Sequence, residues 1–80
     1  MTGQAEKASR FLSLHHGERP LLLPNPWDQG SARLLASLGF AALATTSSGY
    51  AATLGRPDGA VAREEALEHA ASIVRTTTQL

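Results

Sequence analysis

Hydrophobic residues recur along the chain with two different periods, and the alternation of these periods predicts its elements. Spacings of three and four residues, typical of an amphipathic helix, occur near the start, in the middle and near the end. Two unbroken hydrophobic runs, the first of them bounded by Pro20 and Pro24, are typical of strands covered on both faces. The pattern predicts a helix over 4–16, a strand over 20–24, a helix over 29–38, a strand over 40–44, one helical turn over 50–54 and a helix over 63–77.

The stretch richest in possible chemistry, 43–59, begins at the end of the second predicted strand. Its hydroxyl residues Thr46, Ser47 and Ser48 have no bulky neighbours until Tyr50, so backbone N–H groups and hydroxyls could both reach a carboxylate or phosphate. Ligands bind at the carboxyl ends of strands in parallel sheets. The same residues also suit a Ser/Thr turn that only caps the next element, and composition leaves both interpretations open.

Two aspartates near predicted strand ends have different interpretations. Asp28 directly precedes the helix over 29–38, where its carboxylate is predicted to cap the first free N–H groups. Asp58 stands between Pro57 and Gly59, which by itself indicates an ordinary turn.

Histidines and glutamates give weak signals for a metal site. His15 and His16 lie at the end of the first predicted helix, where capping and packing are favoured over metal binding. The last helix carries further possible ligands, for which a solvated surface is favoured: Glu64, Glu65, Glu68 and His69.

Composition narrows the possible partners. The 80 residues include seven basic and seven acidic side chains, and no basic cluster is long enough to neutralise several phosphates, so nucleic acid is not expected as a partner. No hydrophobic run approaches the roughly 20 residues of a membrane span, so no membrane association is expected. The absence of cysteine and of a signal-peptide pattern favours the cytoplasm.

Five segments of the chain resemble, in order, the opening of one enzyme family. They are Leu14-His-His-Gly17, Leu22-Leu-Pro-Asn-Pro-Trp-Asp28, Gly30-Ser-Ala-Arg-Leu-Leu35, Gly39-Phe40 and Thr46-Ser-Ser-Gly-Tyr-Ala-Ala-Thr-Leu-Gly-Arg-Pro-Asp-Gly59. Together they resemble the isocitrate lyase/phosphoenolpyruvate mutase family over nearly all of the chain from Phe11 onward.

The resemblance implies a TIM (β/α)8 barrel, a fold that takes about 250 residues. With 80 residues, the chain is expected to form one partial α/β domain over 1–80, the N-terminal quarter of the barrel. The expected order is α-β-α-β-α with two parallel strands. Such a piece should be marginally stable alone, and we expect a truncated or partial gene product.

The family's chemistry is Mg²⁺-dependent cleavage or formation of a C–C or P–C bond next to a carbonyl, on small 2-hydroxy or 2-oxo carboxylic acids. The resemblance implies that Thr46, Ser47 and Ser48 hold the substrate carboxylate and that Asp58 holds a metal-bound water as an outer-shell partner. In the family, the direct metal ligands and the catalytic loop lie on later strands. No catalytic residue is therefore expected in this chain, which should be inactive alone.

Two other interpretations stay open. The chain could be a non-catalytic module that pairs with copies of itself, as a homo-oligomer, or with the remainder of a split barrel. It could also be a small anion-binding protein unrelated to the lyases.

Overall fold

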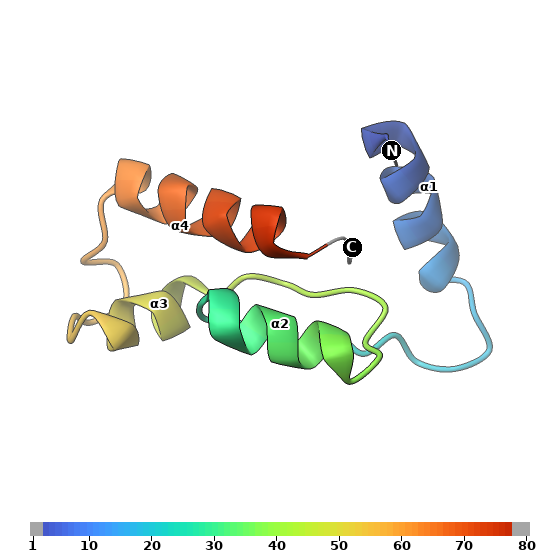
Figure 1. Ribbon diagram of the computed structural model, residues 1–80, viewed down its shortest axis with the longest axis horizontal. Helices are drawn as coiled ribbons and strands as arrows, with labels where there is room; N and C mark the ends of the chain where they lie inside the picture. Colours follow the sequence, from blue (N-terminus) through green and yellow to red (C-terminus); the bar gives the residue numbers. More distant parts are fainter. Residues whose placement is uncertain (1–2, 78–80) are drawn as a thin grey trace.

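The computed structural model describes residues 3–77, which form four helices joined by extended segments. The helices are α1 (Gln4–Leu14), α2 (Gln29–Ser37), α3 (Ser47–Thr53) and α4 (Arg63–Thr76). α2 and α4 run side by side in the same direction, α3 lies at one end of this pair, and α1 stands at the other (Figure 1). None of the helices within 3–77 is long and apolar enough to span a bilayer.

The predicted helices are confirmed, with small changes at their ends. α1 stops at Leu14, and α2 ends before Gly39, whose positive φ of 93° turns the chain away from the helix axis. The turn predicted over 50–54 is longer than expected, because α3 begins at Ser47. The hydroxyl-rich run therefore forms the cap and first turn of a helix.

The predicted fold class is wrong for the described residues, since 3–77 contain helices and no strand. The order α-β-α-β-α with two parallel strands, expected as a quarter of a barrel, is not seen. The two predicted strand segments nevertheless touch where they end: the N–H of Ala44 donates to the carbonyl of Pro24 at 3.0 Å.

Proline explains why this contact does not extend into a parallel ladder. With Ala44 bonded to the carbonyl of residue 24, the next ladder bond would run from the N–H of residue 26 to the carbonyl of Ala44. Residue 26 is proline and has no N–H, and Pro24 lacks the preceding donor in the same register. The side-chain amide of Asn25 takes the place of the missing donor, at 2.8 Å from the carbonyl oxygen of Ala44.

The core is small for a chain of this length. Its fully buried residues are mostly alanines, together with Pro26 and Ile73. The surface is 5751 Å², whereas a compact monomer of 8.4 kDa would expose about 4600 Å². Large apolar side chains lie open to solvent on several elements: Leu12, Leu22, Leu34, Leu38, Leu67 and Val74 are all more than half exposed.

The start of α2 is held by reciprocal hydrogen bonds. Asp28 Oδ1 accepts from the N–H of Ser31 at 2.7 Å, and the Ser31 hydroxyl accepts from the N–H of Asp28 at 3.1 Å. The predicted capping role of Asp28 is confirmed. These hydrogen bonds with Ser31, and the positive charge available at His69, lower the pKa of the Asp28 carboxyl below its ordinary 3.8.

The Asp28 cap should make the stability of the protein depend on pH. Because the folded-state pKa of Asp28 is lowered, its contribution is complete above 3.8 and is lost as pH falls through the folded value. We expect Asp28→Ala to lower the free energy of unfolding at about pH 7 and to differ much less from the wild type at about pH 2. Urea unfolding followed by circular dichroism measures this. Glu18→Ala, at an exposed loop carboxylate, is the matched control, and an Asp28→Ala effect that is equal at both pH values would contradict the assignment.

Candidate functional site

The first turn of α3 is organised by Thr46. Its Oγ1 accepts a hydrogen bond from the N–H of Gly49 at 3.1 Å, which makes Thr46 the helix cap. Ser48 Oγ lies 3.5 Å from the same Thr46 oxygen and is exposed. Of the three hydroxyls predicted to bind substrate, that of Thr46 thus accepts the cap hydrogen bond, and its O–H group can still donate.

The loop after α3 carries Asp58 and is tied down on both sides. The N–H of Arg56 donates to the carbonyl of Ala51 at 2.9 Å. Its guanidinium contacts both carboxylate oxygens of Glu65, at 3.0 and 2.9 Å. Glu65 also accepts from the N–H of Ala62 at 3.3 Å, so it closes the start of α4 where Ala62 offers no capping side chain. The Arg56 contact, followed by the Ala62 hydrogen bond, lowers the pKa of Glu65.

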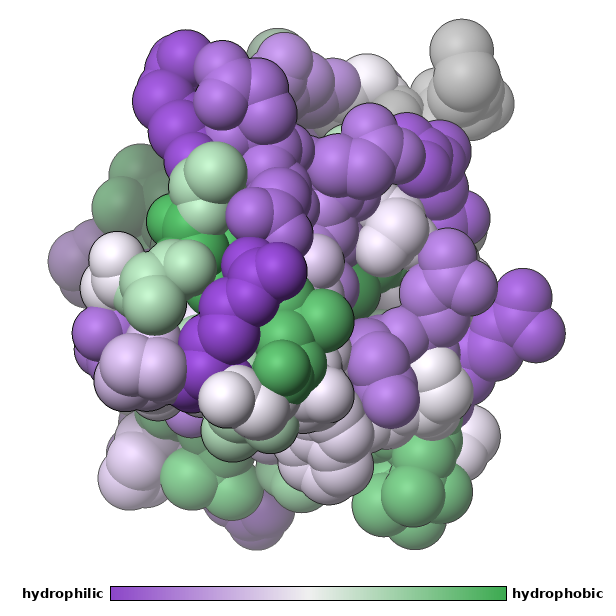
Figure 2. Space-filling model, turned by 90° about the vertical axis from the view of Figure 1, so that its left-hand side faces the viewer, coloured by the Kyte–Doolittle hydropathy of each residue, from purple (hydrophilic) through white to green (hydrophobic). Residues whose placement is uncertain are grey.

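Two small hollows open between α3, this loop and α4. The Asp58 hollow, of about 140 Å³, is lined by Ser47, Tyr50, Asp58, Gly59, Val61 and Ala66. The His69 hollow, of about 100 Å³, is lined by Thr45, Thr46, Ser47, Tyr50, Ala66, His69 and Ala70. Ser47 and Tyr50 belong to both, so the hollows adjoin. Figure 2 shows this end of the molecule, where hydrophilic side chains alternate with hydrophobic ones.

The structure brings Ser47 and Asp58 together. Ser47 Oγ lies 3.5 Å from Asp58 Oδ1, at the outer limit of a hydrogen bond, and both line the Asp58 hollow. Thr46 reaches only the adjoining His69 hollow. Ser48 is exposed and lines neither of the two.

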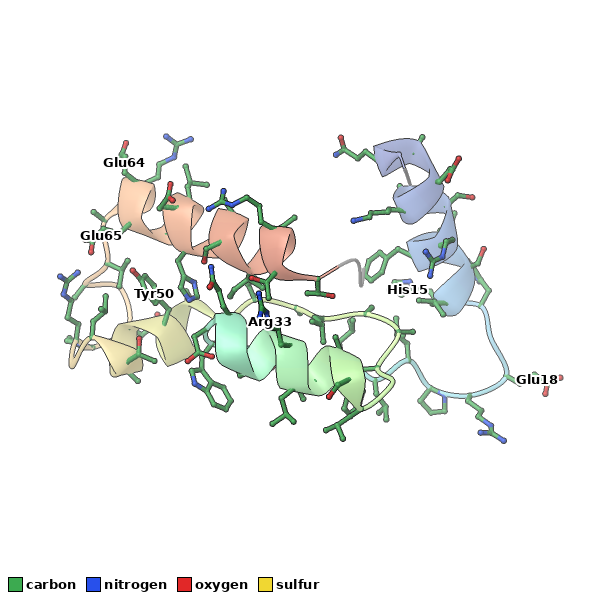
Figure 3. All side chains as sticks on the ribbon, viewed as in Figure 1. His15, Glu18, Arg33, Tyr50, Glu64 and Glu65 are labelled. Atoms are coloured by element: carbon green, nitrogen blue, oxygen red, sulfur yellow. The ribbon has the colours of Figure 1, made fainter. Side chains whose placement is uncertain are left out.

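Tyr50 is a site residue that the sequence pattern did not single out, and the pattern gave His69 only as a possible metal ligand on a solvated surface. Their rings stack with centroids 3.7 Å apart and an angle of 17° between planes. His69 Nε2 also lies 2.7 Å from the carbonyl oxygen of Trp27, so α4 is tied both to α3 and to the segment before α2. In Figure 3, Tyr50 rises from α3 toward α4.

The helical spacing of α4 indicates that His69 faces inward. Ala66, Ala70 and Ile73 form the inward stripe of α4, and position 69 falls on the same side of the helix. The prediction of a solvated surface is therefore wrong for His69, which is half-buried, and right for Glu64 and Glu68, which are exposed.

The remaining candidates stay structural. Nδ1 of His15 lies 2.7 Å from the carbonyl oxygen of Phe11, and the His15 ring packs edge-on against the Phe11 ring. Both contacts fit the predicted capping and packing. Within residues 3–77 no group of three histidine, aspartate or glutamate side chains could hold a metal ion directly.

The comparisons with known proteins agree on one family. The phosphoenolpyruvate phosphomutase family matches residues 11–80, which is most of the chain. This protein belongs to the phosphoenolpyruvate phosphomutase family. The resemblance expected from the five sequence segments is confirmed.

Two solved structures contain a part with the same fold as this chain. A protein from Burkholderia cenocepacia named as a lyase/mutase is 51% identical, with a TM-score of 0.86 over 91% of this chain and 26% of that chain. A second protein from the same organism, named as a phosphonomutase, is 45% identical, with a TM-score of 0.86 over 92% of this chain and 30% of that chain.

Curated relatives are also longer than this chain. Two strains of Mycobacterium tuberculosis have an uncharacterized protein that is 47% identical over 49 residues, or 61% of this chain and 19% of the relative. The family member described here thus spans less than a third of each of these relatives.

Close packing inside the α3 turn gives a prediction about Gly49. A Cβ at this position would lie 2.6 Å from Thr46 Cγ2, so the threonine must rotate and weaken its cap. We expect Gly49→Ala to cost about 1 kcal/mol of unfolding free energy, although alanine is the better helix former. The double variant Thr46→Ser/Gly49→Ala, which removes Cγ2 and keeps the hydroxyl, should recover part of the loss in urea unfolding. A double variant less stable than the sum of the single changes would contradict the contact.

Proposed function

We propose that this chain supplies an acid-binding part of a lyase or mutase that acts on small 2-hydroxy or 2-oxo carboxylic acids. The observation that carries the proposal is the meeting of the Ser47 hydroxyl and the Asp58 carboxylate in one hollow. A hydroxyl donor and a carboxylate acceptor side by side suit two different tasks, which are holding an anion and holding water. Family membership adds the lyase or mutase class.

Ser47 is the best-placed residue for the substrate carboxylate. It lines both hollows, whereas Thr46 lines only the His69 hollow. Thr46 contributes by fixing the turn that carries Ser47. Ser48 lines neither hollow, so it is not expected to contact the bound acid.

Asp58 fits Mg²⁺ as an outer-shell partner. Mg²⁺ keeps several waters and takes few protein carboxylates, and the one carboxylate in this hollow can accept hydrogen bonds from such a water. A direct ligand set is not present among residues 3–77. When bound, Mg²⁺ would polarise the acid's oxygens and stabilise an enolate.

Turnover needs groups beyond these residues. Stabilising the enolate that forms when a C–C or P–C bond next to a carbonyl breaks calls for a directly bound metal ion, and no group of carboxylates and histidines among residues 3–77 could hold one. The 80-residue chain should therefore bind the acid without converting it.

Calorimetric titration with oxalate, with and without Mg²⁺, tests the proposal. Ser47→Ala should weaken oxalate binding about five-fold, the effect of one hydrogen bond, and Ser48→Ala, on the outer side of the same turn, should leave it unchanged. Asp58→Asn should abolish the gain from Mg²⁺. Equal effects of Ser47→Ala and Ser48→Ala, or sustained release of pyruvate or glyoxylate from hydroxy dicarboxylates, would contradict the proposal.

The exposed hydrophobic surface favours a second role, association with copies of the chain. Leu34 of α2 is 60% exposed, and Leu38, which caps the end of the helix four residues later, is 66% exposed. The whole chain also has more surface than a compact monomer of its mass.

Sedimentation equilibrium tests this second role. The wild type should be dimeric or larger at micromolar concentrations, and Leu34→Glu/Leu38→Glu should shift it toward monomer. The matched control is Arg33→Glu/Ser37→Glu, at polar positions of the same helix. A folded wild-type monomer at these concentrations would argue against the role.

A further inference from the structure

His69 has one ring nitrogen already engaged. Its Nε2 lies 2.7 Å from the Trp27 carbonyl oxygen, and a carbonyl oxygen can only accept. Nε2 must therefore carry a proton in both the neutral and the charged imidazole. The nitrogen left for a ligand is Nδ1, which in the neutral ring is a hydrogen-bond acceptor.

The His69 hollow suits a short acid. Its volume of about 100 Å³ corresponds to roughly three waters at about 30 Å³ each. The hydroxyl-bearing residues Thr45, Thr46 and Ser47 line it together with His69, and the rest of its lining is Tyr50, Ala66 and Ala70. A carboxylate can thus meet hydroxyl donors while the neighbouring carbon lies toward His69.

We propose that the His69 hollow selects 2-hydroxy acids over 2-oxo acids, with the substrate hydroxyl donating to Nδ1 of His69 and the carboxylate accepting from Ser47. This inference rests on the proposed function, since it names the preferred acid of the same site. His69 then acts as a specificity-determining residue.

Hydrogen-bond chemistry gives the direction of the preference. A hydroxyl can donate to Nδ1, whereas a 2-oxo oxygen only accepts and would set two acceptors against each other. A site that must leave an acceptor unpaired discriminates against the wrong ligand. The preference should amount to about five-fold in affinity, the range of a single hydrogen bond.

The stacked ring keeps Nδ1 in place. Tyr50 covers one face of the imidazole, and the Trp27 hydrogen bond fixes rotation in the ring plane. Asp28 is the charged group whose field reaches His69 from α2, and Tyr50 is the titratable group on α3. The comparison of ligands is made at about pH 8.

Lactate and pyruvate are the probes, because they differ only in the hydroxyl and oxo group. Calorimetric titration of the 80-residue chain at about pH 8 should give about five-fold tighter binding of lactate, in either enantiomer, than of pyruvate. His69→Gln places an amide donor where Nε2 stood, so it keeps the tie to Trp27 and loses the Nδ1 acceptor. This variant should bind lactate and pyruvate equally.

Tyr50→Phe is the matched control, because it keeps the stack and should keep the preference. Circular dichroism verifies that both variants retain the wild-type helix content. Equal binding of lactate and pyruvate by the wild type, or an unchanged preference in His69→Gln, would overturn the inference and leave the proposed function standing. Absence of binding by lactate, pyruvate and oxalate alike would overturn the proposed function, and the inference with it.

Discussion

The hydrogen bond between His69 and the Trp27 carbonyl, formed across 42 positions of sequence, is the contact on which the site depends. The residues buried between the helices are mostly alanines, and these contribute little hydrophobic free energy. His69 joins α4 to the chain before α2 and, through its stack on Tyr50, to α3. Without this tie, the cleft between α3 and α4 would have few contacts to define its width.

Neighbouring polar residues of the α3 turn have different roles: Thr46 holds the turn, and Ser47 lines the site. Thr46 caps the helix and Gly49 leaves room for the threonine methyl, so Ser47 is free to face both hollows. In the loop after α3, the Arg56–Glu65 pair holds the segment that carries Asp58. The pair is about 40% exposed, so its role lies in positioning the loop more than in stability.

Local signals in the sequence predicted the helices and the cap at Asp28, because these depend on neighbours three and four residues apart. The strands could not be predicted correctly from their hydrophobic runs, because a strand also needs donors in register, and Pro24 and Pro26 remove two of them. The meeting of Ser47 with Asp58 was expected only from the resemblance. The contacts of His69 could not be predicted, because its partners, Trp27 and Tyr50, are distant in sequence.

The position of the proton on the His69 ring, which the Trp27 carbonyl should hold on Nε2, can be measured directly from the imidazole ¹⁵N chemical shifts at about pH 8. The chain contains its own references. His15 contacts the Phe11 carbonyl through Nδ1 and should show the opposite tautomer, while the exposed His16 should show exchange-averaged shifts. The account predicts a protonated Nε2 and an unprotonated Nδ1 for His69. Averaged shifts like those of His16, or a proton on Nδ1, would contradict it.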